Sequence, residues 1–331
     1  MQQEEERRNL GKNKKRAILL MAYGSPDKVV DIEPYYTHIR HGRKPAREEL
    51  ENLKERYAAI GGHSPLFELT QSTAIKLETH LNSKLSGPRI RVYVGMKHWH
   101  PYIAEEFEKI VSEGTTDLLS IALAPHYSKM SIGSYQDAVR QASMDHGSKI
   151  ALQFVDQWHL DPVFIKKWVE RVRIATNKHF LENVGNNRKK EFPFYLFTAH
   201  SLPERISTWN DPYKNQLLET ASEIAKNMRL DKSQFDFAFQ SAGHTSEPWL
   251  GPDILDKLKE LAKDGRKNVL VVPIGFVSDH LEILFDIDKE AKLLGEELGV
   301  KVERTESFND SDDFIEVLYS VVARSGFLSE A

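Results

Sequence analysis

The sequence contains no cysteine among its 331 residues. This absence excludes disulfides, thiolate zinc sites, cysteine-ligated iron–sulfur clusters and cysteine nucleophiles. Any metal ion that the protein handles must therefore bind to histidine, carboxylate, tyrosine or backbone oxygen. That set of ligands suits ferrous iron or a similar divalent ion.

Long apolar runs and an excess of charge of one sign are also absent. No run approaches the ~18 apolar residues that a membrane helix needs. Residues 1–16, MQQEEERRNLGKNKKR, lack the apolar stretch of a secretory signal, and we predict a disordered leader and a cytoplasmic protein. The 45 basic and 49 acidic residues leave a net charge of -4, without the basic excess typical of nucleic-acid binding.

Two common catalytic or binding motifs are missing from the loops where they would be expected. No GxGxxG follows the first predicted strand, and Gly61-Gly62 lacks the Lys-Ser/Thr pair of a phosphate loop. Neither Ser25 nor Ser201 lies in the GxSxG frame of a nucleophile elbow. The sequence therefore argues against nucleotide binding and against a serine hydrolase.

Short apolar runs alternate with longer helical patterns along the chain, which is typical of α/β proteins with parallel sheets. We predict two Rossmann-like domains with parallel four-stranded sheets, at 17–155 and 156–311. A C-terminal helix within 312–327 should pack back on the first domain. The predicted strands are 17–22, 90–95, 119–124, 150–155, 194–199, 235–240, 268–273 and 299–304.

The two halves resemble each other in sequence. LLMAYGSP at 19–26 aligns with LFTAHSLP at 196–203, and SIALAPHYSKMSI at 120–132 aligns with LVVPIGFVSDHLEI at 270–283. Ligands of such folds bind beyond the carboxyl ends of the strands. We therefore expect a cleft between the domains, where the polar residues that follow the strands converge: Tyr23, Lys97, His98, His126, His200, Ser241, His244, Asp279 and Glu282.

Three carboxylates recur every fourth residue in the segment 279–290, DHLEILFDIDKE. Glu282, Asp286 and Glu290 would lie on one face of a helix. A solvated acidic face is the simpler interpretation of this spacing. The position directly after a strand end favours the other, a carboxylate track that guides a hydrated divalent cation.

His200 follows a strand in the polar turn TAHSLPE. A histidine on an apolar face is usually part of the core, but one at the carboxyl end of a sheet is more often a ligand or a base. Neutral imidazole can bind a divalent metal or accept a proton near pH 7.

Basic residues are concentrated in 35–64, in YYTHIRHGRKP and LKERYAAIGGHSP. Arg40 and Arg56 could dock carboxylates, because a guanidinium binds a carboxylate through two parallel hydrogen bonds. A solvated basic helix face is the alternative.

Taken together, eight motifs in order make the chain resemble the ferrochelatases: LLMAYGSP, YYTHIRHGRKP, LKERYAAIGGHSPL, GMKHWHP, LAPHYS, TAHSLPE, PWLGPD and VPIGFVSDHLEILFD. The resemblance covers the chain from about residue 17 to the C-terminal helix. It is strongest to the bacterial branch that acts on coproporphyrin III. It implies the chelatase fold and a lyase of haem biosynthesis that inserts ferrous iron into coproporphyrin III.

The resemblance also implies roles for individual residues. His200 and Glu282 would be catalytic and would form the inner iron site, which Asp286 and Glu290 extend as a ladder. Tyr23 would be the axial ligand of the product iron. The porphyrin contacts would be Arg40, Arg56, Tyr57, Ser64 and Tyr135.

Iron enters this scheme as a substrate, and the resemblance implies neither a permanently bound cofactor nor an iron–sulfur cluster. Transient contact with the next haem-pathway enzyme is expected. Either His200 or Glu282 could take the pyrrole protons. Three other functions stay open: a ferrochelatase for protoporphyrin IX, a cobalt or nickel chelatase for sirohydrochlorin, and a non-catalytic carrier of haem or coprohaem.

Overall fold

A computed structural model describes residues 14–182, 191–243 and 247–328. The chain divides into two compact units. The first takes its residues from 1–51, 65–158 and 309–331, and the second from 52–64 and 159–308. Residues 52–64, which the sequence alone places in the first domain, thus group with the second unit.

The predicted leader is described only at its end, since residues 1–13 lie outside the described part of the chain. The backbone N–H of Lys15 donates to Thr116 Oγ1 over 2.9 Å, and the first strand begins at Arg16. Residues 14–16 of the predicted leader therefore belong to the described part of the chain, and its first strand begins one residue before the predicted boundary at residue 17.

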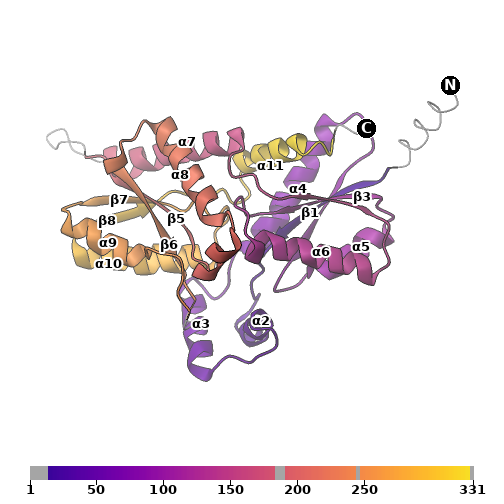
Figure 1. The fold of residues 1–331 in the computed structure, drawn as a ribbon, viewed down its shortest axis with the longest axis horizontal. Helices are drawn as coiled ribbons and strands as arrows, with labels where there is room; N and C mark the ends of the chain where they lie inside the picture. The colour runs from indigo at the N-terminus through magenta and orange to yellow at the C-terminus, as the bar shows by residue number, and fades with distance from the viewer. Residues whose placement is uncertain (1–13, 183–190, 244–246, 329–331) are drawn as a thin grey trace. The chain divides into compact units, whose positions relative to one another are not determined.

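The first unit contains a parallel four-stranded sheet in the order β2-β1-β3-β4. Figure 1 labels two of its strands, β1 and β3. Its strands are β1 (Arg16–Ala22), β2 (Arg91–Met96), β3 (Asp117–Ala122) and β4 (Ala151–Val155). Its helical segments are η1 (Val29–Asp31), α2 (Ile32–Ile39), α4 (Leu66–Lys84), α5 (Ile103–Ser112), η2 (Lys129–Gly133), α6 (Ser134–Asp145) and α11 (Asp312–Arg324).

The central strand β1 is buried on both faces of this sheet, which explains its nearly continuous apolar sequence. Leu19 and Met21 pack in one core cluster with Phe107 of α5 and Val139 of α6. The helix α4 packs against β1 and β2, and α11 packs against α4.

The second unit repeats this topology with the strand order β6-β5-β7-β8. Its strands are β5 (Phe194–His200), β6 (Phe235–Gln240), β7 (Asn268–Val272) and β8 (Lys301–Arg304). Its helical segments are α7 (Pro162–Thr176), η3 (Asn177–Leu181), η4 (Glu204–Trp209), α8 (Tyr213–Met228), η5 (Lys232–Gln234), α9 (Ile254–Lys263), η6 (Ile283–Ala291) and α10 (Lys292–Leu298). The boundary between the units falls inside α3 (Arg47–Ala59).

The core of the second unit joins the sheet to the segment that carries the predicted carboxylate ladder. Leu196 of β5 and Val271 of β7 lie in one cluster with Leu258 of α9 and with Ile283 and Ile287 of η6. The helices α7 and α8 contact β7 and β6 and pack against each other. The apolar residues of η6 thereby anchor its acidic residues beside the sheet.

The eight predicted strands are confirmed to within two residues at each end, as is the pair of parallel four-stranded sheets. Their success has a physical basis, because strands of a doubly covered parallel sheet are short apolar runs between polar turns. Among the described residues, no helix is long and apolar enough to cross a membrane.

Candidate functional site

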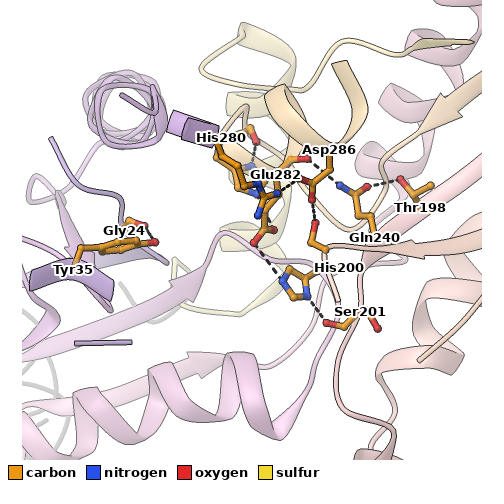
Figure 2. A network of polar contacts seen from close by, with 12 residues as sticks. Gly24, Tyr35, Thr198, His200, Ser201, Gln240, His280, Glu282 and Asp286 are labelled. Atoms are coloured by element: carbon orange, nitrogen blue, oxygen red, sulfur yellow. Dashed lines mark hydrogen bonds and ion pairs between the residues drawn. The ribbon is translucent and has the colours of Figure 1, made fainter. Parts of the chain in front are cut away.

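His200 is the last residue of β5, directly after six buried residues. Its Nε2 lies 3.3 Å from Oε1 of Glu282, and its Nδ1 contacts the carbonyl oxygen of Ser201 (Figure 2). Carbonyl and carboxylate oxygens only accept hydrogen bonds, so both ring nitrogens act as donors. In this arrangement His200 is therefore an imidazolium ion.

Glu282 directly precedes η6, and its backbone is fixed by a buried amide. Gln240 Nε2 donates to the carbonyl of Glu282 over 3.1 Å, and Thr198 Oγ1 donates to Gln240 Oε1 over 3.0 Å. The second carboxylate oxygen of Glu282 lies 3.4 Å from Nε2 of His280. The carboxylate therefore lies between two imidazole rings.

The charges of this pair stabilise each other. Burial alone would lower the pKa of His200, but the carboxylate of Glu282 outweighs it and raises this pKa to about 9. Burial alone would raise the pKa of Glu282, but His200 holds that pKa below its usual value. At neutral pH the pair holds one proton, on His200.

Asp286 and Glu290 of the ladder lie on a π-helix, which Glu282 directly precedes, whereas the sequence pattern predicted an ordinary helix. The η6 segment, Ile283–Ala291, has the wider i→i+5 hydrogen-bond pattern. Apolar periodicity cannot separate the two forms, because both keep residues four apart close together. Such segments are rare and are frequent at functional sites.

Asp286 is buried on η6, and both of its carboxylate oxygens have partners. Oδ1 pairs with the guanidinium of Arg56, and Oδ2 accepts a hydrogen bond from Ser241 Oγ. Burial raises the pKa of Asp286 to about 6, although Arg56 acts in the opposite direction. Glu290, the last residue of the predicted ladder, is exposed on the same helix.

Within the described ranges, no three His, Asp or Glu side chains are arranged so that they could hold a metal ion. His200 and Glu282 pair with each other, and Asp286 pairs with Arg56. The metal-binding role of His200, Glu282, Asp286 and Glu290 therefore stays a prediction, for which the His200–Glu282 pair offers one nitrogen and one oxygen ligand.

Asp279, which we expected to join this cluster, contacts a different residue. Its carboxylate lies 3.2 Å from Arg304, which also binds Asp288 at 2.8 Å. Arg304 lies at the end of β8, and the carboxylates that it binds lie on both sides of Glu282 and Asp286 in the chain. It therefore clamps the segment that carries the ladder. His244 lies outside the described residues.

Of the polar residues that we expected to converge after the strands, four belong to the first unit: Tyr23, Lys97, His98 and His126. Tyr23 follows β1 and is 43% exposed, with its ring centroid 4.5 Å from that of His98. Burial lowers the pKa of His98 to about 3, so its imidazole is neutral. Lys97 Nζ lies 5.3 Å from the centre of the Tyr135 ring, and His126 is buried.

The predicted porphyrin contacts differ in exposure. Arg40 Nη1 lies 2.8 Å from the carboxylate of Glu49, so its guanidinium already binds a carboxylate of the protein. Arg56, which pairs with Asp286, has a side chain that is 24% exposed. The remaining three predicted contacts, Tyr57, Ser64 and Tyr135, are buried, with 2%, 3% and 6% of their surface exposed. Their contact with a porphyrin stays a prediction.

Three residues that shape the site were not predicted. Gln240 orients the backbone of Glu282, Tyr213 donates from its hydroxyl to the carbonyl of His200 over 3.0 Å, and Arg304 clamps the ladder segment. Gln240 ends the largely apolar strand β6 with a polar side chain, and that signal could have found it. Arg304 has no such signal, because β8 (KVER) is mostly charged. Tyr213 has no comparable signal, because it opens an ordinary helix.

Comparison with known proteins was made by sequence and by structure. The family model described as Ferrochelatase matches residues 15–325. A protein of Herpetosiphon aurantiacus named ferrochelatase is 44% identical over 93% of this chain and 98% of its own. A coproporphyrin III ferrochelatase of Oceanobacillus iheyensis is 43% identical, over 94% of this chain and 97% of its own. One of Geobacillus kaustophilus is 41% identical, over 94% and 96%.

Solved structures support the fold alone, because their sequence identity to this chain is low. The sirohydrochlorin chelatase SirB of Bacillus subtilis subspecies spizizenii, in complex with cobalt, matches with a TM-score of 0.56. It is 13% identical, over 94% of this chain and 95% of its own. DR2241 of Deinococcus radiodurans, described as similar to chelatases, has a TM-score of 0.52 at 10% identity and covers 95% of this chain and 56% of its own.

Proposed function

This chain belongs to the ferrochelatase family, and we propose that it inserts ferrous iron into coproporphyrin III to give Fe-coproporphyrin in haem biosynthesis. The observation that carries this proposal is the pair of His200 and Glu282 at the carboxyl end of β5. Imidazole and carboxylate together suit a divalent iron in transit. A site with so few ligands also leaves the ion free to move on to the porphyrin.

Iron insertion requires that a hydrated cation loses water, that two pyrrole protons leave and that the ring bends toward the metal. Ligands must be deprotonated before they bind a metal, so binding at His200 expels the proton that the pair holds. Glu282 is already ionised and would attract the cation first. We propose this order: contact with Glu282, loss of the His200 proton to water, then transfer to the porphyrin nitrogens. The two pyrrole protons leave to His200 or Glu282, which the metal has released, and to water.

The preference for coproporphyrin III rests on the relatives that carry this name and on the basic side chains Arg40 and Arg56. A guanidinium binds a carboxylate bidentately, and coproporphyrin has more carboxylates than protoporphyrin IX. Tyr23 as axial ligand of the product iron remains part of the proposal. Protoporphyrin IX is the second candidate, because the Herpetosiphon relative is named ferrochelatase without a stated porphyrin.

The location of the protein and its dependence on other molecules also remain predictions. We propose that it acts in the cytoplasm and that it transiently contacts the next enzyme of the haem pathway. We also propose that it needs no resident cofactor, with iron entering as a substrate.

Anaerobic insertion of ferrous iron tests the proposed function. The change of the Soret band is followed with coproporphyrin III and with protoporphyrin IX in parallel, and we expect faster turnover of coproporphyrin III. Preference for protoporphyrin IX would overturn the substrate but keep the chelatase. Tight binding of both porphyrins without insertion would indicate a carrier.

A pair of histidine variants tests the site itself. His200→Ala should abolish insertion while porphyrin binding, measured by fluorescence, is largely retained. His146→Ala serves as the matched control, because His146 is exposed at the end of α6 in the first unit. Retained insertion in His200→Ala, or an equal loss of porphyrin binding, would refute the assignment.

A further inference from the structure

Arg56 holds a buried carboxylate of the ladder through an ion pair that bridges 230 positions of the sequence. Its guanidinium contacts Oδ1 of Asp286 and lies 4.8 Å from the centre of the Phe285 ring. The Asp286 side chain is 6% exposed and that of Arg56 is 24% exposed. The arginine is therefore the partner that solvent and a ligand can reach.

The two inner carboxylates of the ladder are neutralised in different ways. Glu282 pairs with His200, which can lose its proton when a cation arrives. Asp286 pairs with Arg56, whose guanidinium does not deprotonate in proteins. An incoming cation can displace a proton from His200, but at Asp286 it meets a permanent positive charge. That charge is removed only if the guanidinium moves to another anion.

A carboxylate of the porphyrin is the anion available for this exchange, provided that the proposed function is correct. We propose that Arg56 is an exchangeable counterion that couples the two substrates. Without porphyrin it pairs with Asp286 and keeps the metal out. With porphyrin it pairs with a substrate carboxylate, and Asp286 becomes free to attract the divalent cation.

Coupling of this kind is reciprocal by thermodynamic necessity. A bound porphyrin strengthens cation binding, and a bound cation strengthens porphyrin binding by the same factor. Metal is thereby recruited mainly when a porphyrin is present to receive it. Ser241 holds the other oxygen of Asp286, so the carboxylate keeps its place when the arginine leaves.

Arg40 provides a matched comparison. It also pairs with a carboxylate of the protein, Glu49, which in addition accepts a hydrogen bond from the backbone N–H of Ala46 over 2.7 Å. Both Arg40 and Glu49 belong to the first unit, whereas the His200–Glu282 pair belongs to the second. Exchange at Arg40 would release only Glu49, so Arg40 should contribute to porphyrin binding without changing the affinity for the cation.

Binding of Mn²⁺ to the full-length protein, followed by the electron paramagnetic resonance signal of the free ion, tests the proposal. It is measured with and without zinc coproporphyrin III, which carries the carboxylates but has its centre filled. Mn²⁺ binds nitrogen and oxygen ligands more weakly than Zn²⁺ and leaves the zinc in place. We expect zinc coproporphyrin to lower the Kd of Mn²⁺ about tenfold, within the ~5–150-fold range of allosteric coupling.

Two variants should shift the binding in opposite directions. Arg56→Gln should bind Mn²⁺ about tenfold more tightly than wild type without porphyrin, and zinc coproporphyrin should no longer change that Kd. Asp286→Asn should bind zinc coproporphyrin more tightly than wild type, because Arg56 no longer has a competing partner. A purely structural role of the ion pair predicts weaker porphyrin binding instead. Arg40→Gln should leave the Kd of Mn²⁺ without porphyrin unchanged.

The outcomes separate this inference from the proposed function. An unchanged Kd of Mn²⁺ in a wild-type protein that still metallates coproporphyrin III would overturn the coupling alone. Weaker porphyrin binding by a folded Asp286→Asn protein would do the same. Failure of the wild type both to bind zinc coproporphyrin and to metallate coproporphyrin III would overturn the proposed function and the coupling with it. If a variant fails to fold, the wild-type measurement still decides.

Discussion

Replacement of Glu282 by glutamine should change how the stability of the protein depends on pH. The side chain keeps its size and can still accept a hydrogen bond from His200, but it loses the charge that stabilises the imidazolium. Burial, which alone lowers the pKa of His200, then determines its titration. We therefore expect the pKa of His200 to fall from about 9 to below its ordinary value.

The size of the effect follows from the linkage between pKa and stability. A pKa raised from 6.5 to about 9 corresponds to about 3 kcal/mol of stabilisation at ~1.4 kcal/mol per pH unit. The side chains of His200 and Glu282 are 31% and 28% exposed, so solvent screens part of this interaction. We expect a contribution of about 1–2 kcal/mol after screening.

Whether stability rises or falls with pH follows from the direction of each pKa shift. Because the pKa of His200 is raised on folding, its contribution is full below pH 6.5 and is lost as the pH rises through about 9. Because the pKa of Glu282 is lowered on folding, its contribution is full above pH 4.5 and is lost as the pH falls through the folded value. The pair therefore stabilises the protein most between these limits.

Urea denaturation at pH 6 and at pH 9 measures the effect in both proteins. The free energy of unfolding should fall by about 1–2 kcal/mol more in wild type than in Glu282→Gln over this interval. The other titrating groups are common to both proteins, and among them Asp286 also responds to the substitution, because the charge of Glu282 helps to raise its pKa to about 6. The same dependence on pH in both proteins would refute the ion pair as a source of stability.

Three further substitutions test the supports of the site. Arg304→Met removes a cation from Asp279 and leaves Asp288 with Lys292, whose Nζ lies 3.7 Å away, and should cost about 3 kcal/mol of unfolding free energy. A cost below ~0.5 kcal/mol would contradict the clamp. Gly275→Ala places a Cβ 2.4 Å from the Cβ of Ala199, beside the end of β5. It should cost about 1–3 kcal/mol and slow iron insertion, whereas Gly87→Ala, which meets open space, should do neither. Tyr213→Phe loses one buried hydrogen bond and should lower the melting temperature, at a cost of about 1 kcal/mol; an unchanged melting temperature would show that the bond is not formed.

The duplicated topology could be predicted because local sequence patterns indicate each of its strands. Each strand is an apolar run bounded by polar turns, and the repeated turns after 17–22 and 194–199 place Tyr23 and His200 at equivalent strand ends. A residue at the carboxyl end of a parallel strand faces the ligand side whatever the details of packing. Of the residues expected to converge beyond the strand ends, His200 and Glu282 do lie together, with 3.3 Å between Nε2 and Oε1.

The form of the ladder helix could not be predicted in the same way. The i, i+4, i+8 spacing of its carboxylates fits an α-helix and a π-helix alike, since the difference lies in backbone hydrogen bonds. The partners of the arginines were also beyond the reach of local patterns. From the sequence, Arg40 and Arg56 were predicted to bind carboxylates of a ligand. In the structure each binds a carboxylate of its own unit.

The sequence alone determined the α/β class, the positions of the strands, the family resemblance and the chemical types available to the site. Without cysteine, that site can offer a metal ion only imidazole, carboxylate, phenol or backbone oxygen ligands. The tertiary structure decided which of these groups are charged and which are neutralised: His200 by Glu282, and Asp286 by Arg56. The physical reason is that charge and pKa depend on distance and burial between residues far apart in the chain, which no local pattern encodes.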